Sequence, residues 1–490
     1  MRPNILHLFT DQQRFDTISA LGNPHIHTPN FDRLVHEGTA FTRAYSPSPE
    51  CVPARASMIT GWYPPRTNCY CNEQAMPAED TPTYMHHLSS NGYNTVGIGK
   101  CHFTKDPHAL RGFQKRFSQE EIVEDRDADD YARWLVEEGY DWVLEPHGVR
   151  GEMYYVPQVS VLPERAHPVT WVADHTIQYI ECQGKAEEPW YAFCSFVHPH
   201  PPFAPPVPWH KSYRAPNMPL PDMPQSLDDL LCFVNRFQNR YKYRDRGIDL
   251  NLVRCIRAYY YACVSFIDWQ LGRIFKALEE SGQWDNTLIM LSSDHGEYLG
   301  DYGCFGKRGM HEVSARVPML VRWPGGEYAG RTCSEVASLV DLAPTILEAA
   351  EIPFSPEDFD GCSLRNVVAG KANREYVYSQ YNRAENGLYL MVSKNWKYIF
   401  SAPDQREYLF DCLNDPGEHH NLAQSPSHRE TLLRLRKDCL NWLHEVGEHE
   451  ATDGSGTWRQ YPKRSIPSDP DSGLIYQDPP WWQGALQSPS

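Results

Sequence analysis

The segment CVPAR at residues 51–55 holds the residue types with the clearest chemical potential in the chain. Cys51 precedes Arg55 by four positions, about one helical turn, and the residues SMITG carry the segment to position 61. A cysteine in such a place has three interpretations: a buried core residue, a thiolate nucleophile, or the precursor of another reactive group. The cysteine by itself leaves all three open.

Further polar residues follow four apolar runs that are typical of buried strands. They are Asp11 and Gln12 after 4–10, Lys100 at the end of 94–100 with His102 two residues later, His198 at the end of 190–198, and Asp294 and His295 within 286–296. Ligands of a parallel sheet bind beyond the carboxyl ends of its strands, so we expect these side chains to share one site. Oxygen and imidazole donors at two of these ends are suited to a divalent cation.

Each of these residues also has a structural interpretation. Asp11 would serve equally well as a turn or helix cap. In the segment HPHPP, either His198 or His200 could be a structural loop residue, and we favour His198 for the site because it ends the strand directly. His311 and Arg316 stay open between substrate contact and structural pairing.

The elements that would position these residues alternate along most of the chain. Strand-like runs and helical patterns, the latter at 28–38, 83–93 and 250–280, predict an α/β fold with a large, mostly parallel sheet. Beyond residue 370, strand patterns at 387–400 and 406–423 precede an amphipathic helix at 428–447, as in a smaller α+β domain with an antiparallel sheet. We therefore predict a catalytic domain at 1–370, a small domain at 371–450 and a C-terminal extension at 451–490.

Composition excludes several classes of partner. The formal net charge is −17 over 490 residues, which argues against binding to nucleic acid or to an anionic membrane. No apolar run approaches the roughly 20 residues that span a bilayer, and no secretory signal is visible, so we expect a cytoplasmic protein. The fourteen cysteines show no C-x-x-C pair and are expected to be reduced.

The segment CVPAR followed by S-x-x-T-G resembles the signature of the type I sulfatases, of the alkaline-phosphatase-like superfamily. The resemblance extends over PNILHLFTDQQ, SDHGEYLGDYGCFGK and YLFDCLNDPGEHHNLA. It implies a large mostly parallel sheet sandwiched by helices, with a smaller C-terminal α+β domain. It also implies that a maturation enzyme converts Cys51 to formylglycine, whose hydrate, a gem-diol, is the nucleophile.

The same resemblance implies one divalent cation. Its ligands would be Asp11, Gln12, Asp294, His295 and residue 51. Many family members carry an acidic residue in place of Gln12 and an asparagine in place of His295. The expected ion is calcium, with magnesium or manganese as alternatives.

The remaining roles are also carried over from the family. Lys100 and Lys307, the latter eleven residues after Gly296, would hold the sulfate oxygens. His102 would take a proton from the diol and His198 would protonate the leaving alcohol. Arg55 would pair with the diol and the metal-binding carboxylates, and Asn72 is a candidate substrate contact.

The predicted function is hydrolysis of a sulfate ester of a small organic molecule or carbohydrate. The main alternative is a phosphonate or phosphate monoester hydrolase of the same superfamily, and the pair Lys100 and His102 favours sulfate. A catalytically inactive protein that binds sulfated glycans and a sulfuryl transferase are further alternatives. Candidate sugar-stacking residues are Trp62, Tyr63, Tyr70 and Trp209, and the tail segment PPWWQGALQ is a candidate contact in a homo-oligomer.

Overall fold

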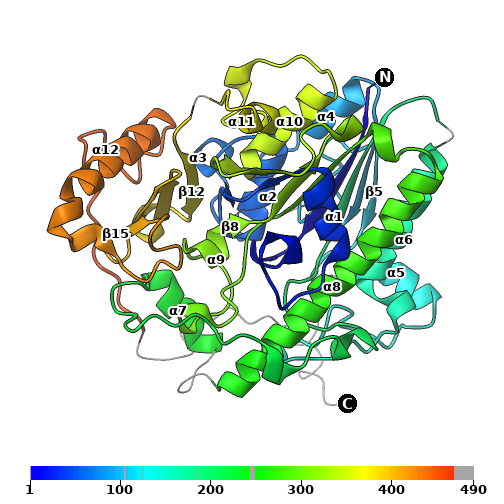
Figure 1. Cartoon of the computed structure of the whole chain (residues 1–490), viewed down its shortest axis with the longest axis horizontal. Helices are drawn as coiled ribbons and strands as arrows, with labels where there is room; N and C mark the ends of the chain where they lie inside the picture. Colours follow the sequence, from blue (N-terminus) through cyan, green and yellow to red (C-terminus); the bar gives the residue numbers. More distant parts are fainter. Residues whose placement is uncertain are drawn as a thin grey trace.

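A computed structural model describes residues 2–467, with gaps at 75, 104–105, 107, 124, 185, 243–248 and 373. Its centre is an eight-stranded sheet with the order β10-β2-β9-β7-β1-β6-β4-β5 (Figure 1). The central strand β1 (Asn4–Thr10) pairs in parallel with β6 (Trp190–Phe196) and β7 (Thr287–Ser293). These strands are almost wholly buried, as expected of a parallel sheet covered on both faces.

Helices cover the two faces of the sheet in separate groups (Figure 1). Along β1 the side chains alternate, so that Leu6 and Leu8 enter one core and Ile5 and Phe9 enter the other. The first core contains residues of α1 (Pro29–Glu37), α6 (Pro168–Gln183) and α8 (Leu250–Glu280). The second contains residues of α2 (Cys51–Thr60), α4 (Tyr84–Ser90) and α10 (Leu342–Ala349).

The edges of the sheet are built from short strands. On one side, β4 (Asn94–Gly99) and β5 (Lys115–Ser118) continue the parallel pairing. On the other side, β9 (Met319–Arg322) runs antiparallel to its two neighbours, β7 and β2 (Thr39–Phe41). Strand β2 in turn pairs in parallel with the outermost strand, β10 (Arg331–Cys333). A three-stranded sheet consists of β11 (Ala337–Ser338), β3 (Ala44–Tyr45) and β8 (Arg316–Val317). Further helices are α3 (Pro64–Thr67), α5 (Asp130–Glu137), α7 (Phe233–Lys242), α9 (Glu312–Ala315) and α11 (Leu364–Val368).

A second sheet follows in the C-terminal part of the chain. It is antiparallel and consists of β12 (Val377–Tyr381), β13 (Leu388–Val392), β14 (Trp396–Ser401) and β15 (Arg406–Asp411). Helix α12 (Arg429–Glu445) packs on it through a third buried cluster (Figure 1). The predicted fold class, a large mostly parallel α/β sheet with a smaller α+β unit, is therefore confirmed.

The C-terminal extension is only partly within the described residues. Trp458 is buried and its ring stacks on Phe400 at a centroid separation of 4.0 Å. Residues 468–490, with the candidate subunit contact PPWWQGALQ, lie outside the described residues. Among the helices that the structure describes, none combines the length and apolar character needed to cross a membrane.

A buried lysine joins the C-terminal sheet to helix α9. Lys397 of β14 is fully buried and forms ion pairs with Glu312 of α9 and, at 2.6 Å, with Glu418. Its Nζ also donates to the carbonyl oxygen of Met310 at 3.2 Å. This one ammonium group therefore compensates two carboxylates that are almost shielded from solvent.

We expect Lys397→Met to lower the free energy of unfolding by about 3–5 kcal/mol, because it leaves the buried Glu418 without a cation and Glu312 with Arg316 alone. The matched control is Lys394→Met, which removes an exposed ion pair with Glu335 and should cost at most about 1 kcal/mol. Urea unfolding of the two variants measures the difference. Equal losses would show that the buried ion pairs do not hold the second sheet in place.

Candidate active site

Helix α2 places Cys51 at its first position, beyond the carboxyl end of β1. Every residue of this helix is buried. Pro53 is tolerated because the first turn of a helix has no intrahelical acceptors for its N–H groups. At the other end, Gly61 adopts the left-handed conformation, φ 72°, that terminates the helix.

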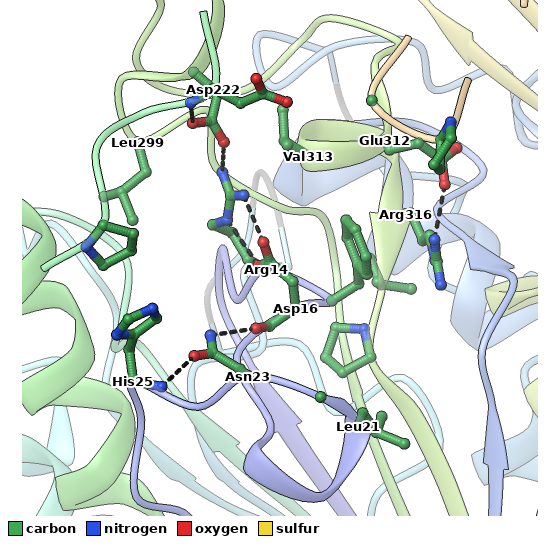
Figure 2. Close-up of a pocket in the computed structure, with 18 of the residues that line it drawn as sticks. Arg14, Asp16, Leu21, Asn23, His25, Asp222, Leu299, Glu312, Val313 and Arg316 are labelled. Carbon is green, nitrogen blue, oxygen red and sulfur yellow. Dashed lines mark hydrogen bonds and ion pairs between the residues drawn. The ribbon is translucent and has the colours of Figure 1, made fainter. Parts of the chain in front are cut away.

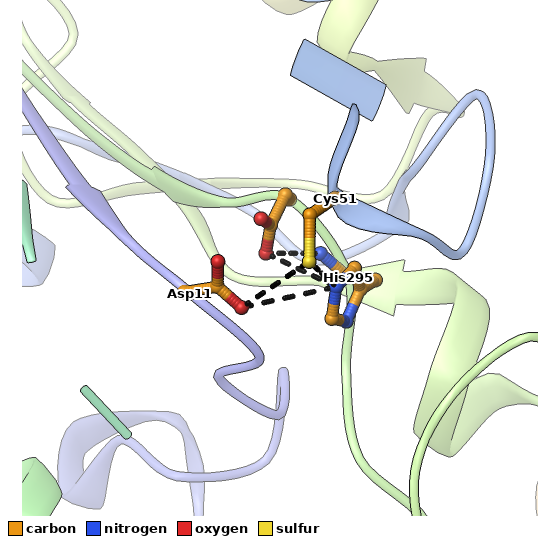
Figure 3. A group of neighbouring side chains, drawn as sticks. Asp11, Cys51 and His295 are labelled. Atoms are coloured by element: carbon orange, nitrogen blue, oxygen red, sulfur yellow. Dashed lines mark hydrogen bonds and ion pairs between the residues drawn. The ribbon is translucent and has the colours of Figure 1, made fainter. Parts of the chain in front are cut away.

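Four buried side chains converge at the start of α2. The candidate ligand atoms of Asp11, Cys51, Asp294 and His295 all lie within 4.8 Å of one another. Cys51 Sγ is 3.3 Å from His295 Nε2 and 3.7 Å from Asp11 Oδ1 (Figure 3). His295 Nδ1 donates to the carbonyl oxygen of Gly296 at 3.0 Å, which leaves the lone pair of Nε2 directed at the cluster.

Gln12 supplies a direct test of whether these residues fit a cation. Its Oε1 is buried and has no hydrogen-bond partner, whereas its Nε2 donates to the carboxylate of Glu297. Its backbone N–H donates to Asp294 Oδ1 at 3.0 Å from a left-handed conformation, φ 64°. A buried carbonyl oxygen without a donor next to two carboxylates and an imidazole fits a divalent cation.

Two fixed cations hold the carboxylates of this cluster. Arg55 Nε lies 3.0 Å from Asp294 Oδ2, and its Nη2 lies 3.1 Å from Asp11 Oδ2. Lys100 Nζ lies 2.7 Å from the same oxygen of Asp11. Burial alone would raise the pKa of Asp11, but these cations, with His200 and Lys307, hold it well below its usual range. Asp11 is therefore an anion in the folded protein.

Lys307 contacts the thiol directly. Its Nζ lies 2.8 Å from Cys51 Sγ and 3.1 Å from His200 Nε2. Burial and Asp11 would raise the pKa of the Cys51 thiol, yet Lys307, Lys100 and His295 together lower it well below its usual value. Position 51 is thus an environment that stabilises negative charge.

Of the two histidines in HPHPP, the structure brings His200 to Lys307. His200 Nδ1 donates to the carbonyl oxygen of Pro201 at 2.8 Å, so Nε2 is available to the cavity. Burial lowers the pKa of His200, and the nearby Glu121 opposes this effect.

His198 lies apart from this contact, although the sequence favoured it. Its ring packs against His167 and His147, at centroid separations of 5.0 and 6.0 Å, and neither ring nitrogen has a hydrogen-bond partner in the described part of the chain. Burial and the proximity of His200 lower its pKa to about 3. Because strand β6 ends at Phe196, the loop that follows decides which histidine turns toward the cluster.

His102 and Asn72 are held mainly through backbone contacts. The backbone N–H of His102 donates to Glu120 Oε1 at 3.1 Å from a left-handed conformation, φ 56°. Asn72 Oδ1 accepts a hydrogen bond from the N–H of Val52 at 2.9 Å and so caps the first turn of α2. The predicted roles of His102 and Asn72 toward substrate stay predictions.

A cavity of about 60 Å³ opens beside the cluster. Its lining residues are Gln12, Asn72, Glu121, Tyr154, Tyr155, His200, Gln238, Gly306, Lys307 and Arg308. Several of these, including Glu121, Tyr155 and Gln238, come from loops or from α7 and carry no strand-end signal that would have revealed them in the sequence. Glu297, which fixes the amide of Gln12, was missed although it lies two residues after His295.

The aromatic residues expected to stack on a sugar lie elsewhere. The Tyr63 ring packs edge-on against Tyr378 and Trp442, and Trp209 packs on Phe266. Within the described residues, the aromatic side chains that line the small cavity are instead Tyr154 and Tyr155. The sequence identified aromatic residues in predicted loops but could not show which aromatic side chains reach the site.

A separate cavity of about 440 Å³ shares no lining residue with the first one in the described part of the chain. Its charged groups pair with one another: Arg14 contacts Asp16 at 2.7 Å and Asp301 at 2.8 Å, and Arg316 contacts Glu312 at 3.1 Å (Figure 2). Arg316 therefore has a structural partner here and lies outside the lining of the small cavity.

Comparisons with known proteins cover nearly the whole chain. The family model described as Sulfatase matches residues 3–352, and a model described as N-sulphoglucosamine sulphohydrolase, C-terminal, matches residues 300–445. An arylsulfatase of Clostridium perfringens is 30% identical over 95% of this chain and 99% of that protein. A choline-sulfatase of Rhizobium meliloti is 31% identical over 87% of this chain and 83% of that protein.

Among solved structures, the phosphonate monoester hydrolase of Agrobacterium radiobacter has a similar fold. Its TM-score is 0.77 at 25% identity, with 91% of this chain and 96% of that chain covered. The comparisons therefore include relatives named for sulfate esters and for a phosphonate ester.

Proposed function

Because the chain belongs to the sulfatase family, we propose that it hydrolyses the sulfate ester of a small organic molecule or carbohydrate with a modified residue 51 as nucleophile. The observation that carries this proposal is the position of Cys51 Sγ. It lies 3.3 Å from His295 Nε2, 3.7 Å from Asp11 Oδ1 and 2.8 Å from Lys307 Nζ. The side chain proposed as the source of the nucleophile thus lies next to two candidate metal ligands and to a lysine that can bind an anion.

The reaction needs two groups besides the side chains. Formylglycine at position 51, formed from cysteine by a maturation enzyme, would supply an aldehyde hydrate whose hydroxyl group is the nucleophile. A divalent cation, calcium with magnesium or manganese as alternatives, supplies positive charge against the sulfate oxygens. Asp11, Gln12, Asp294, His295 and residue 51 would hold it, and the unpartnered Oε1 of Gln12 supports this ligand set.

The chain's own residues bind and orient the ester. Lys307 lines the cavity and holds a sulfate oxygen, and Lys100 adds positive charge from behind Asp11. Arg55 keeps both carboxylates in place through two ion pairs. In place of His198, we assign proton transfer to the leaving alcohol to His200 in its protonated form, because its Nε2 lies 3.1 Å from Lys307 Nζ at the cavity and Glu121 lies 3.4 Å from its Nδ1.

We expect His200→Ala to lower kcat for a sulfated sugar by about 10²–10⁴-fold, because an alkoxide leaves poorly without a proton. An aryl sulfate with an acidic leaving phenol should be affected much less. His198→Ala is the matched control and should leave the ratio of the two substrates near that of the wild type. A larger and substrate-dependent loss in His198→Ala would restore the assignment made from the sequence.

Phosphonate monoester hydrolysis is the second candidate function, supported by the overall fold and by the Asp-Gln and Asp-His pairs of the cluster. A turnover screen with an aryl sulfate, sulfated monosaccharides and an aryl phosphonate monoester separates the two. We expect sulfate esters to give the higher kcat/KM. Turnover of the phosphonate without turnover of any sulfate ester would reject the first proposal in favour of the second.

A further inference from the structure

A carboxylate faces the anion-binding cavity. Glu121 lines the cavity together with Lys307 and His200, and its side chain is 11% exposed. Its Oε2 lies 2.6 Å from Lys100 Nζ, and its Oε1 lies 2.7 Å from Arg150 Nη2 and 3.4 Å from His200 Nδ1. Burial would raise the pKa of Glu121, but the surrounding cations hold it well below its usual range. The carboxylate is therefore a negative charge in the wall of a site for negative esters.

Glu121 also controls how much positive charge reaches the cavity. Lys100 is fully buried and bridges Asp11, at 2.7 Å, and Glu121, at 2.6 Å, so its charge is opposed on both sides. Three arginines near the site also have carboxylate partners: Arg55 pairs with Asp11 and Asp294, Arg150 with Glu121, and Arg308 with Glu50. In the described part of the chain, Lys307 is the cavity cation that has no carboxylate within ion-pair distance.

We propose that Glu121 is a specificity-determining residue that restricts the site to esters carrying a single negative charge. The inference rests on the proposed function, which places the ester in this cavity. Sulfate monoesters and phosphonate monoesters are monoanions, whereas a phosphate monoester is a dianion at pH 8. Coulomb repulsion scales with the product of the charges, so the carboxylate penalises the dianion twice as strongly as the monoanions. Burial at the cavity wall limits screening by salt.

The test compares three substrates with one leaving group, 4-nitrophenyl sulfate, 4-nitrophenyl phenylphosphonate and 4-nitrophenyl phosphate, on wild type and Glu121→Gln. At pH 8 we expect kcat/KM for the phosphate, relative to the sulfate, to rise by at least about tenfold in the variant. The phosphonate-to-sulfate ratio should stay within about threefold, because both substrates are monoanions. The ratios cancel any general loss of activity from a displaced Lys100.

The control variant is Asp127→Asn, which removes one negative charge from an exposed position on the same loop and should leave all ratios unchanged. An unchanged phosphate-to-sulfate ratio in Glu121→Gln would overturn the inference. An equal rise for both phosphorus esters would also overturn it, because the cause would then be the reacting centre and not its charge. If the wild type cleaves no sulfate ester, the proposed function fails, while the phosphonate-to-phosphate ratio still tests Glu121.

A second measurement needs only the wild type, should the variant not fold. A phosphate monoester takes up a proton near pH 6 and becomes a monoanion, whereas a sulfate ester does not titrate. We expect the phosphate-to-sulfate ratio of kcat/KM to rise as the pH falls from 8 to 5. Shared titrations of enzyme groups, including His200 beside Glu121, cancel in this ratio. A flat ratio would show that the site does not select single charge.

Discussion

Cys51→Ala should reduce turnover of an aryl sulfate by about 10⁴-fold or more, because it removes the group from which the nucleophile is made. The environment of residue 51 would remain, since Lys307, His295 and Asp11 are held by other contacts. Steady-state kinetics measure the loss. Intact mass of the peptide containing residue 51 in the wild type should show a residue lighter than cysteine, as formylglycine is.

Cys51→Ser sharpens this expectation. A serine hydroxyl can attack sulfur once, but it has no second hydroxyl with which to expel sulfate, so the protein should retain one sulfuryl group after a single turnover. Cys182→Ala changes an exposed cysteine and is the control, with no expected effect on rate. Wild-type turnover by Cys51→Ala would rule out covalent catalysis at this position.

Asp294→Asn should lower kcat/KM for the same substrate by about 10³-fold or more, the scale of losing a preorganised charge at the reacting centre. The change removes a candidate metal ligand and the partner of the buried Arg55 Nε. Elemental analysis of purified protein should show bound calcium, magnesium or manganese in the wild type and less in the variant. Treatment with a chelator should reproduce the loss, and return of the ion should reverse it.

Asp285→Asn is the matched control for this substitution. Its side chain is 94% exposed and its contact with Arg322 is 3.6 Å long, so both rate and metal content should equal those of the wild type. Full activity of a chelated protein shown to be free of metal would contradict the proposed role of the cluster. A variant that binds the ion normally but is inactive would instead place the effect in the loss of the Arg55 pair.

The long elements of the fold could be predicted from the sequence. The expected strand at 4–10 is β1, and the expected helix at 250–280 is α8, because both carry strong apolar patterns that local chemistry dictates. Short edge strands such as β8 (Arg316–Val317) and β11 (Ala337–Ser338) were not predicted. Two residues show no periodicity, and their extended form depends on the partners that they meet in the folded chain.

The candidate site divides in the same way. Asp11, Asp294 and His295 follow strands of one parallel sheet, so the sequence could place them together, and their ligand atoms lie within 4.8 Å of one another and of Cys51. Glu121 follows β5 by only a short loop, but its approach to Lys100 depends on tertiary packing. His198 and His200 have the same chemistry two positions apart, so only the path of the loop could distinguish them.

Cys51 is 0% exposed in the folded protein, beneath the cations and carboxylates that surround it. In the proposed mechanism a maturation enzyme must therefore reach the thiol before the chain closes over it. Folding and modification then compete for the same newly made molecule, and the active fraction of a preparation is a ratio of two rates. A variant that folds faster would be purified as a well-ordered protein with fewer working sites.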